Sequence, residues 1–557
     1  MHYRSLGKRV GNAVRLAEVI QVLARHGFAD LVRRAGLHEG VPARLLRGLR
    51  LIEAPTGEPE TFGQRLRAVL TALGPTFVKC GQVLSTRPDL LDPEICKELE
   101  LLQDRVAPLP FEAMRSVIEE SLNGSVEEMF AEFNREPVAA ASLSQVYRAR
   151  LKDGRPVAVK ARRPGIEAVI EADLELMRSI AEWVSEHVED LRWYAPQGIV
   201  EEFARSIRRE LDFSIEAHVI DRFYQNFEDN ELVFIPRTYP ELSSRQVLTM
   251  DWVDGIRLDM VDKYPERDSQ PEVVAELGCN IVCEQVFEHR LFHADPHPGN
   301  IMLTCENQIA FLDYGMAGHI ERTDVAIIAD LLHAMFRDDA AACVEAILRL
   351  TATDEPENRS ALEHEMAEFI AFEGHAIVSG GQVGRGIDRA IEVLRRHHLE
   401  LAPRFSLLLK ALATIESVGH ALDPDMDMVP IIQPYVEDIL RQRYSPFQVM
   451  SDAQHNFADM MRLGRQLPAE IQQLFRMLRR GRMKIQLNHE KLQNLAAVLD
   501  TASNRVTFGV ITGSIIIGSS LLMTTDIGAR DLGLAGYIIA GVLGVSLLIS
   551  IIRSKKL

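Results

Sequence analysis

The segment LFHADPHPGNIMLTCENQIAFLDYG, residues 291–315, contains the polar side chains whose spacing indicates the fold class of this chain. Asp295 and Asn300 are five residues apart in a loop that contains proline and glycine. Asp313 follows the apolar run 309–312. Carboxylate and amide oxygens are the ligands that Mg²⁺ prefers in proteins. The segment therefore predicts a site for a magnesium ion.

A second segment, REPVAAASLSQVYRARLKDGRPVAVK (135–160), has the pattern of a strand, a tight turn at Asp153-Gly154 and a second strand that ends at Lys160. Such a hairpin can cover the phosphates of a nucleotide. Loops of this kind are normally rich in glycine, because their backbone N–H groups must approach phosphate oxygens. Here alanine, which excludes positive φ, takes the place of glycine, so we expect the loop to hold a nucleotide in a changed pose or less tightly. The loop residues are Ala139, Ala140, Ala141 and Ser142.

A strand lysine followed by an Asp…Asn…Asp-x-Gly series is the arrangement of protein kinases. There the first Asp, here Asp295, addresses the attacking hydroxyl or water. The Asn and the second Asp, here Asn300 and Asp313, hold Mg²⁺ between the phosphates. Lys160 would pair with the α- and β-phosphates and with a carboxylate on a helix. The order and spacing of all these motifs favour a kinase-like fold that binds ATP and Mg²⁺.

Three features depart from ordinary protein kinases. The arginine that usually precedes the catalytic Asp is Ala294, so control by phosphorylation of an activation loop is not expected. No APE sequence follows residues 313–315, which indicates that the segment that seats a protein substrate is missing. Lys160 is also far along the chain from its expected partner Glu216, with an extra helix between them.

Two histidines of the loop, His293 and His297, raise the alternative of a transition-metal site, but no third ligand accompanies them. His293 occupies the position of the structural loop histidine of kinases, so a structural role is favoured. The role of His297 stays open.

These motifs resemble those of the UbiB family of atypical kinases, also called ABC1-type kinases. The sequence KCGQ, with Lys79, Gly81 and Gln82, matches the family motif KxGQ, and AAAS (139–142) matches its alanine-rich loop. ELD, with Glu210 and Asp212, matches the motif ExD, and Glu216 stands at the position of the αC glutamate. The segment 407–428 looks like the helical signature of the family.

The resemblance implies a set of site roles. The catalytic residues would be Asp295, Lys160 and Glu216. Nucleotide would be bound by Lys160, by Met250 and by the loop residues Ala139, Ala140, Ala141 and Ser142. Asn300 and Asp313 would hold the metal. A gate would form where KxGQ and ExD meet over the active site, from Lys79, Gln82, Glu210 and Asp212.

The resemblance also implies a function. Family members support ubiquinone biosynthesis, have ATPase activity and are thought not to phosphorylate proteins as ordinary kinases do. Two alternatives remain at this point: a true kinase for a protein or a small lipid-like molecule, and a scaffold that binds nucleotide without turnover. Membrane lipids and quinone-biosynthesis enzymes or isoprenoid intermediates are the expected partners.

The expected architecture is an α+β, atypical protein-kinase-like fold, with a small mixed lobe and a mainly helical lobe. Residues 111–133, 163–188 and 197–227 each predict one helix, and the last of these would carry both the ELD motif and Glu216. The expected domains are an N-terminal helical extension (1–110), a small lobe (111–255), a large lobe (256–450), a membrane-proximal helical linker (451–504) and a transmembrane helical hairpin (505–557).

The hairpin is predicted from two segments, 506–524 and 532–552, that contain no charged residue. At 1.5 Å per residue each covers about 30 Å, the thickness of the bilayer hydrocarbon. Arg505 before the pair and Arg553 after it place both ends in the cytoplasm. A hairpin buried in a soluble core is the alternative. Since a C-terminal pair is typical of bacterial members of the family, we expect the bacterial inner membrane.

The composition limits other functions. With 62 basic and 80 acidic residues the net charge is −18, which argues against a nucleic-acid partner. The arginine-rich first fifty residues and the stretch 475–484 are either solvated helix faces or surfaces that rest on anionic lipid. Six cysteines are few for 557 residues and indicate a reducing compartment. The sequence does not predict an oligomeric state.

Overall fold

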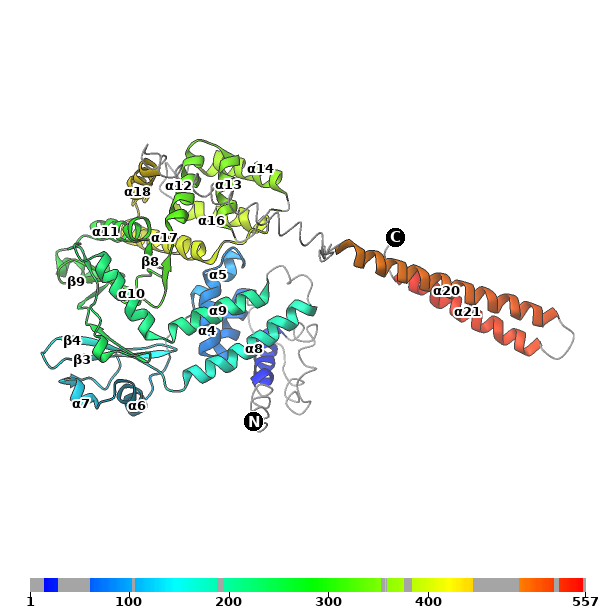
Figure 1. Ribbon diagram of the computed structural model, residues 1–557, viewed down its shortest axis with the longest axis horizontal. Helices are drawn as coiled ribbons and strands as arrows, with labels where there is room; N and C mark the ends of the chain where they lie inside the picture. Colours follow the sequence, from blue (N-terminus) through cyan, green and yellow to red (C-terminus); the bar gives the residue numbers. More distant parts are fainter. Residues whose placement is uncertain are drawn as a thin grey trace, which may run out of the picture. The chain divides into compact units, whose positions relative to one another are not determined.

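The computed structural model describes residues 15–28, 61–102, 106–187, 195–351, 356, 358–374, 383–443, 490–524 and 530–553 (Figure 1). The chain divides into two compact units, residues 1–450 and 451–557, and each is considered by itself. The basic stretch 475–484 and the predicted linker as far as residue 489 lie outside the described residues. The finer domain boundaries inside the first unit stay predictions.

The small lobe is built on an antiparallel sheet of five strands. Its strands are β1 (Glu132–Phe133), β2 (Ala139–Ala140), β3 (Ser144–Arg150), β4 (Pro156–Arg162) and β6 (Val247–Asp251). β3 and β4 pair along their whole length, from Ser144 opposite Arg162 to Arg150 opposite Pro156. The turn between them has a φ of +92° at Gly154, which is the left-handed conformation that the Asp-Gly dipeptide predicted. β6 lies beside β4, and β1 and β2 both pair with β3.

The segment 111–133 is not the single helix that was predicted. α6 (Phe111–Leu122) ends at Asn123, which is left-handed with a φ of 54°. Ser125 then starts the short helix α7 (Val126–Met129) through a capping box with Glu128. The local hydrogen bonds of the caps therefore outweigh the helical periodicity on which the prediction rested.

The segment 197–227 is also divided, into α9 (Pro196–Glu210) and α10 (Phe213–Asn226). Asp212 has an extended backbone and accepts a hydrogen bond from the Ser214 N–H, so it is the N-cap of α10. The ELD motif consequently spans the junction of two helices. Only Glu216 lies within α10.

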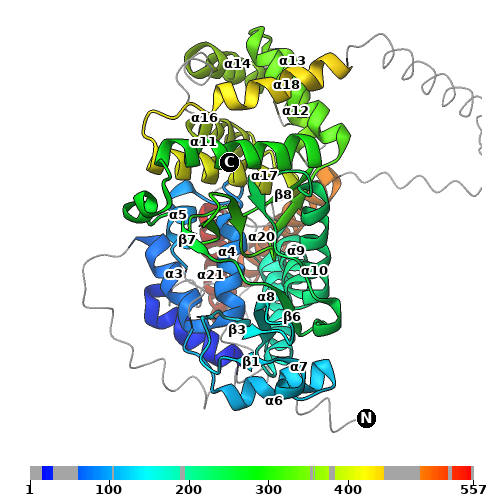
Figure 2. The same cartoon turned by 90° about the vertical axis from the view of Figure 1, so that its left-hand side faces the viewer.

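The N-terminal extension packs on two helices inserted between β4 and α10, as both views show (Figures 1 and 2). These elements are α3 (Phe62–Leu73), α4 (Pro75–Ser85) and α5 (Pro93–Glu100) of the extension, and α8 (Ile166–His187) and α9 of the insertion. Their apolar faces share one buried core that includes Phe77, Leu99 and Phe203. A Cβ at Gly81 would lie 2.3 Å from Leu102 Cδ1, so a larger residue here would require the leucine side chains packed against α4 to move.

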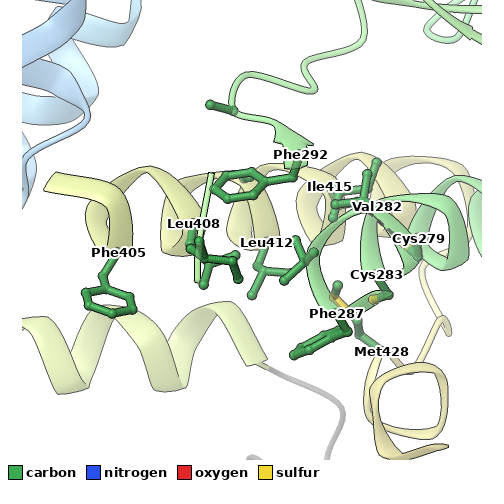
Figure 3. Close-up of a cluster of buried hydrophobic side chains, with 14 of the residues drawn as sticks. Cys279, Val282, Cys283, Phe287, Phe292, Phe405, Leu408, Leu412, Ile415 and Met428 are labelled. Atoms are coloured by element: carbon green, nitrogen blue, oxygen red, sulfur yellow. Dashed lines mark hydrogen bonds between the residues drawn. The ribbon is translucent and has the colours of Figure 1, made fainter. Parts of the chain in front are cut away.

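The large lobe is mainly helical, as predicted for residues 256–450. Its helices are α11 (Pro271–Glu284), α12 (Arg322–Phe336), α13 (Ala340–Leu350), α14 (Arg359–Phe369), α16 (Val383–Arg396), α17 (Pro403–Leu422) and α18 (Val429–Arg443). The short 3₁₀ or π turns of this lobe are η5 (Val261–Arg267), η6 (Gln285–His289) and η7 (Ile370–Gly374), while η1 (Ala24–Phe28) lies in the N-terminal extension and η4 (Pro240–Leu242) in the small lobe. Figure 3 shows the buried faces of α11 and α17 in contact, with Cys279 and Cys283 on one helix and Leu412 and Ile415 on the other. α17 is therefore a central core helix.

Two small sheets present the segment 291–315. One has the order β5 (Val233–Phe234), β10 (Ile309–Phe311), β9 (Ile301–Thr304) and β7 (Gly255–Arg257). The other pairs β8 (Leu291–His293) with β11 (Ala317–His319). The loop with Asp295 lies between β8 and β9, and Asp313 follows β10, so short strands hold both ends of the motif.

The described part of the second unit is a pair of packed helices, α20 (Glu490–Thr524) and α21 (Arg530–Arg553). A Cβ at Gly536 would lie 2.0 Å from Ser519 Oγ, so the two helices approach closely at this point. The predicted boundary at residue 505 falls inside α20, which is continuous there. Large apolar side chains such as Ile517 and Ile538 are exposed on the pair.

Among the described residues one helix, α17, is long and apolar enough to cross a membrane, but half of it is buried within the large lobe. α20 and α21 contain shorter apolar stretches, Val506–Leu521 and Leu534–Val545.

Candidate active site

Lys160 of β4 and Glu216 of α10 form a buried ion pair. Lys160 Nζ lies 2.8 Å from Glu216 Oε1 and 2.9 Å from Oε2, and 3.3 Å from Asp313 Oδ1. The Phe213 ring lies 5.3 Å from the ammonium group. Burial alone would lower the pKa of Lys160, but the carboxylates of Asp313 and Glu216 outweigh it and raise that pKa. The lysine is therefore positively charged. It contacts Glu216 although two helices lie between its strand and α10 in the chain.

Asp313 joins this pair from the strand end after β10. The positive charge of Lys160 holds the pKa of the Asp313 carboxyl well below its usual range. The Gly315 N–H donates a 3.1 Å hydrogen bond to Asp313 Oδ1, the same oxygen that faces Lys160. The side chain is 52% exposed, so the carboxylate is ionised, oriented and accessible to a ligand.

His293 connects the loop that carries Asp295 with the strand end that carries Asp313. Its ring is buried, stacks on Phe311, and contacts the backbone carbonyl of Asp313 through Nε2. Nδ1 accepts a 3.2 Å hydrogen bond from the Asp295 N–H. Burial lowers the pKa of His293, so the neutral ring donates at one nitrogen and accepts at the other. This is the structural role that the sequence favoured.

His297 lies on the same loop and is half-exposed. Its Nδ1 accepts a 3.0 Å hydrogen bond from the Gly299 N–H. In the part of the chain that the structure describes, no three His, Cys, Asp or Glu side chains are grouped as a metal site. The described residues therefore give no support to the transition-metal alternative.

Asn300 and Asp313 fit a magnesium ion. Asn300 Nδ2 donates to the Asp295 carbonyl at 3.3 Å, which leaves the side-chain oxygen of Asn300 for a cation. The Asn300 carbonyl accepts a 2.9 Å hydrogen bond from the Leu312 N–H. Since Leu312 directly precedes Asp313, this bond holds the two expected metal ligands, Asn300 and Asp313, next to each other. Mg²⁺ commonly binds one or two protein oxygens and completes its shell with phosphate and water oxygens. This donor set meets that requirement.

The alanine-rich loop is tied down by residues that the sequence did not single out. Ala139 and Ala140 form β2, and none of the three alanines has a positive φ. Arg163 Nε donates to the Ala141 carbonyl at 2.9 Å, and Arg163 Nη2 donates to the Ala107 carbonyl at 3.0 Å. No sequence motif predicts these contacts of Arg163, because the acceptors are backbone carbonyls from two distant segments.

Ser142 and Met250 are both buried. Among the described residues, none forms a hydrogen bond with Ser142 Oγ. Met250 lies on β6 opposite Ala158 of β4 and belongs to the core that also contains Phe213. Contact of these two residues with a nucleotide stays a prediction.

The first expected result concerns Ala140→Gly. Glycine would restore the freedom to adopt positive φ and loosen β2 by roughly 0.5–1 kcal/mol, which corresponds to about a two- to fivefold change in nucleotide affinity. We expect tighter binding or a changed preference between ATP and ADP, measured by calorimetry. If affinity and nucleotide preference both equal those of the parent, the alanines do not restrain the nucleotide.

The four predicted gating residues do not all contact one another. Lys79 Nζ lies 2.6 Å from Glu210 Oε1, and both side chains are largely buried. Glu210 Cγ is also 3.9 Å from the Cβ position of Gly315, next to Asp313. Asp212, the other carboxylate of the ELD motif, caps α10 and pairs with Arg245 at 2.8 Å. Gln82 Nε2 donates to the Leu102 carbonyl at 3.1 Å, within the extension itself.

A buried arginine that the sequence did not single out joins three parts of the first unit. Arg87 pairs with Asp89 of its own segment at 2.8 Å, with Glu202 of α9 at 3.1 Å and with Glu400 before α17 at 2.8 Å. The Leu401 N–H donates to Asp89 Oδ2 at 3.2 Å. Since Arg87 and Asp89 are almost fully buried, this network fastens the extension to the large lobe.

A strand lysine paired with a helix glutamate, a loop with Asp and Asn, and an Asp-x-Gly turn together define a site of the protein-kinase class. They lie between a small mixed lobe and a larger helical lobe, as in that class. Comparison with known proteins is more specific. Residues 101–347 match the ABC1 atypical kinase-like domain, residues 381–427 the UbiB helical domain, and residues 490–553 the ABC1/UbiB kinase-like C-terminal domain.

Curated relatives agree with these matches. A probable protein kinase UbiB of Cellvibrio japonicus is 34% identical over 82% of this chain and 82% of its own length. A probable protein kinase UbiB of Pseudomonas putida is 37% identical over 70% of this chain and 73% of its own. An uncharacterized protein in the hydrogenase 1 5′ region of Clostridium pasteurianum is 30% identical over 98% and 99%. The chain therefore belongs to the ABC1/UbiB family of atypical kinase-like proteins, which confirms the predicted family and fold class.

Among solved structures, the complex of Rv3197 with erythromycin from Mycobacterium tuberculosis aligns with a TM-score of 0.44 at 21% sequence identity. The alignment covers 65% of this chain and 92% of that one.

Proposed function

We propose that this protein is a membrane-tethered, Mg²⁺-dependent ATPase that supports the biosynthesis of an isoprenoid quinone such as ubiquinone. The observation that carries the proposal is the contact of Lys160 with both Glu216 and Asp313. A lysine held in this way is placed to bind the α- and β-phosphates of ATP. Mg²⁺, held by Asn300 and Asp313, would neutralise charge on the β- and γ-phosphate oxygens when bound.

Asp295 is the group that receives the proton in this proposal. The attacking oxygen of water forms a bond to the γ-phosphorus while the bond between that phosphorus and the bridging oxygen of ADP breaks. The proton of the water passes to the Asp295 carboxylate, and the products are ADP and phosphate. The two backbone hydrogen bonds that fix Asp295, to His293 and Asn300, support this role.

Hydrolysis is favoured over protein phosphorylation because the extension packs beside the site. The Lys79–Glu210 pair lies next to Gly315, where an ordinary kinase leaves room for a protein substrate. The Arg87 network fastens the same extension to the large lobe. A protein segment could enter only if both sets of contacts were released.

The membrane part of the proposal rests on the second unit and on the family. α20 and α21 expose apolar side chains that water does not favour, and they pack closely at Gly536 as helices in lipid do. We expect the bacterial inner membrane, with the first unit in the cytoplasm. Isoprenoid intermediates, or the enzymes that modify them, are then within reach of the active site.

The direct test is to follow the labelled γ-phosphate of ATP. The purified full-length protein is placed in anionic lipid vesicles, with and without a quinone-precursor mimic. We expect label in free phosphate, with a rate that rises in the presence of the mimic and of Mg²⁺. Label in a lipid or protein product would replace the proposal by a true kinase activity. Nucleotide binding without release of label would make the protein a scaffold.

A further expected result concerns the gate. Lys79→Ala removes the partner of Glu210 and should loosen the extension, because a buried carboxylate without its partner is costly. We expect autophosphorylation to rise while quinone-supporting activity falls. Glu210→Gln should reproduce the effect, and the double variant should add little, since both changes break one pair. Parental label incorporation and full quinone output in Lys79→Ala would remove the gate from the proposal.

A further inference from the structure

We propose that Lys410 of α17 is a positioning residue for Asp295, so that the helical domain of the large lobe completes the active site. This inference rests on the proposed function above. Lys410 Nζ lies 3.3 Å from Asp295 Oδ1. The two side chains are 18% and 27% exposed, so the pair is formed largely away from bulk solvent. No motif in the sequence marks Lys410.

The catalytic loop has no cation of its own for this carboxylate. Residues 291–300 contain neither lysine nor arginine. His297 Nε2 lies 3.8 Å from the other oxygen, Asp295 Oδ2, on a half-exposed ring. In the part of the chain that the structure describes, Lys410 is therefore the permanent positive charge that contacts Asp295.

α17 is a rigid support for this lysine. Leu408 and Ala411, on either side of Lys410 in the sequence, are buried in the large-lobe core. Near its start the helix is fastened to α12 by Arg404, whose Nε lies 2.9 Å from the buried Asp324 carboxylate. A side chain carried on such a helix holds its partner more precisely than one carried on a loop.

The contact bears on the chemistry through orientation and charge. Asp295 presents two oxygens, and an ion pair to Oδ1 leaves Oδ2 to receive the proton of the attacking water. The site already contains the carboxylates of Glu216 and Asp313 and must accept a triphosphate. A lysine beside Asp295 offsets part of that negative charge, and its ammonium group has three N–H donors, only one of which is needed for Oδ1.

The N-terminal extension also has a carboxylate, that of Glu100, on which the charge of Lys410 acts. Burial raises the pKa of Glu100, the last residue of α5, while the charge of Lys410 lowers it and that of Asp295 raises it. Lys410 thus stands near one carboxylate of the extension and one of the catalytic loop. The extension and the catalytic base are coupled through the same cation.

The test compares Lys410→Met and Lys410→Gln with Lys410→Arg in the full-length protein in vesicles. Misplacement of a catalytic group by about 1 Å can cost on the order of 100-fold, so we expect kcat for ATP hydrolysis to fall by about 10- to 100-fold in the neutral variants. Mg-ADP affinity and melting temperature should stay at the parental values. Lys410→Arg should recover most of the rate.

Lys97→Met is the matched control, because Lys97 is an exposed lysine of α5 whose charge also acts on Glu100. Its hydrolysis rate should equal that of the parent. Parental rates in both neutral Lys410 variants would overturn the inference. So would an equal loss of Mg-ADP affinity or of melting temperature without rescue by arginine, since Lys410 would then be structural. If the parent itself releases no phosphate, the proposed function fails instead.

Discussion

Asp313→Asn is expected to lose Mg²⁺-dependent nucleotide binding and to lower ATP hydrolysis by about 100-fold or more, a loss typical of removing one preorganised electrostatic group. The substitution keeps the size of the side chain and removes its charge. Two contacts depend on that charge: the cation site shared with Asn300 and the 3.3 Å contact with Lys160. Thermal-shift titration with Mg-ATP and with metal-free ATP measures the first directly.

A matched control separates this loss from a general effect of removing a carboxylate. Asp259→Asn breaks a surface ion pair with Arg257, which lies 2.5 Å away. Such exposed pairs contribute little to stability. Its Mg-ATP shift should equal that of the parent. An unchanged shift and unchanged hydrolysis in Asp313→Asn would show that Asp313 does not hold the metal.

Removal of residues 490–557 should move the protein almost completely from the membrane fraction to the soluble fraction. This deletion takes away α20 and α21 as whole helices, whereas a cut at residue 501 would divide α20. The first unit has its own buried cores, so we expect it to stay folded and to keep its Mg-ATP thermal shift. Quinone-supporting activity should be largely lost, because the site no longer works at the bilayer.

A full-length control tests whether the helices act through lipid. Ile517 and Ile538 are exposed on the helix pair, and replacing both with lysine should disfavour insertion by about 2.5–3.5 kcal/mol for each charge near the bilayer centre. The double variant should also leave the membrane fraction. If the truncated chain is insoluble and unfolded in detergent-free buffer, the helix pair is part of a soluble core and the anchor assignment is wrong.

Much of the catalytic centre could be predicted because its signals are local. The Asp-Gly turn and the alternation around Val157–Lys160 predicted the hairpin that carries the lysine, and the structure has that hairpin in full register. The spacing of Asp295, Asn300 and Asp313 predicted one loop and one strand end, which is where they lie. His293 was also given its structural role from position alone.

The two helix predictions were wrong where the hydrogen bonds of a helix cap compete with a continuous apolar periodicity. An apolar pattern continues across Leu211 and Phe213, so the sequence indicated one helix over 197–227. The structure ends α9 before this point because the Asp212 side chain caps α10 and the Phe213 N–H bonds to the Arg245 carbonyl. The same competition divided 111–133 at Asn123.

The class of fold, the side chains grouped at the candidate active site and the apolar C-terminal helices could all be predicted from the sequence, since each depends on residue types at short spacing. The folded structure was needed for the remaining charged contacts. Of the two ELD carboxylates it brings Glu210 to Lys79, and it also joins Lys410 to Asp295 and Arg87 to Glu400. Each pair joins elements far apart in the chain, and any exposed lysine or arginine has the same local pattern. Packing of the extension and of α17 brings these side chains together, so the partners follow from the folded core and not from the order of residues.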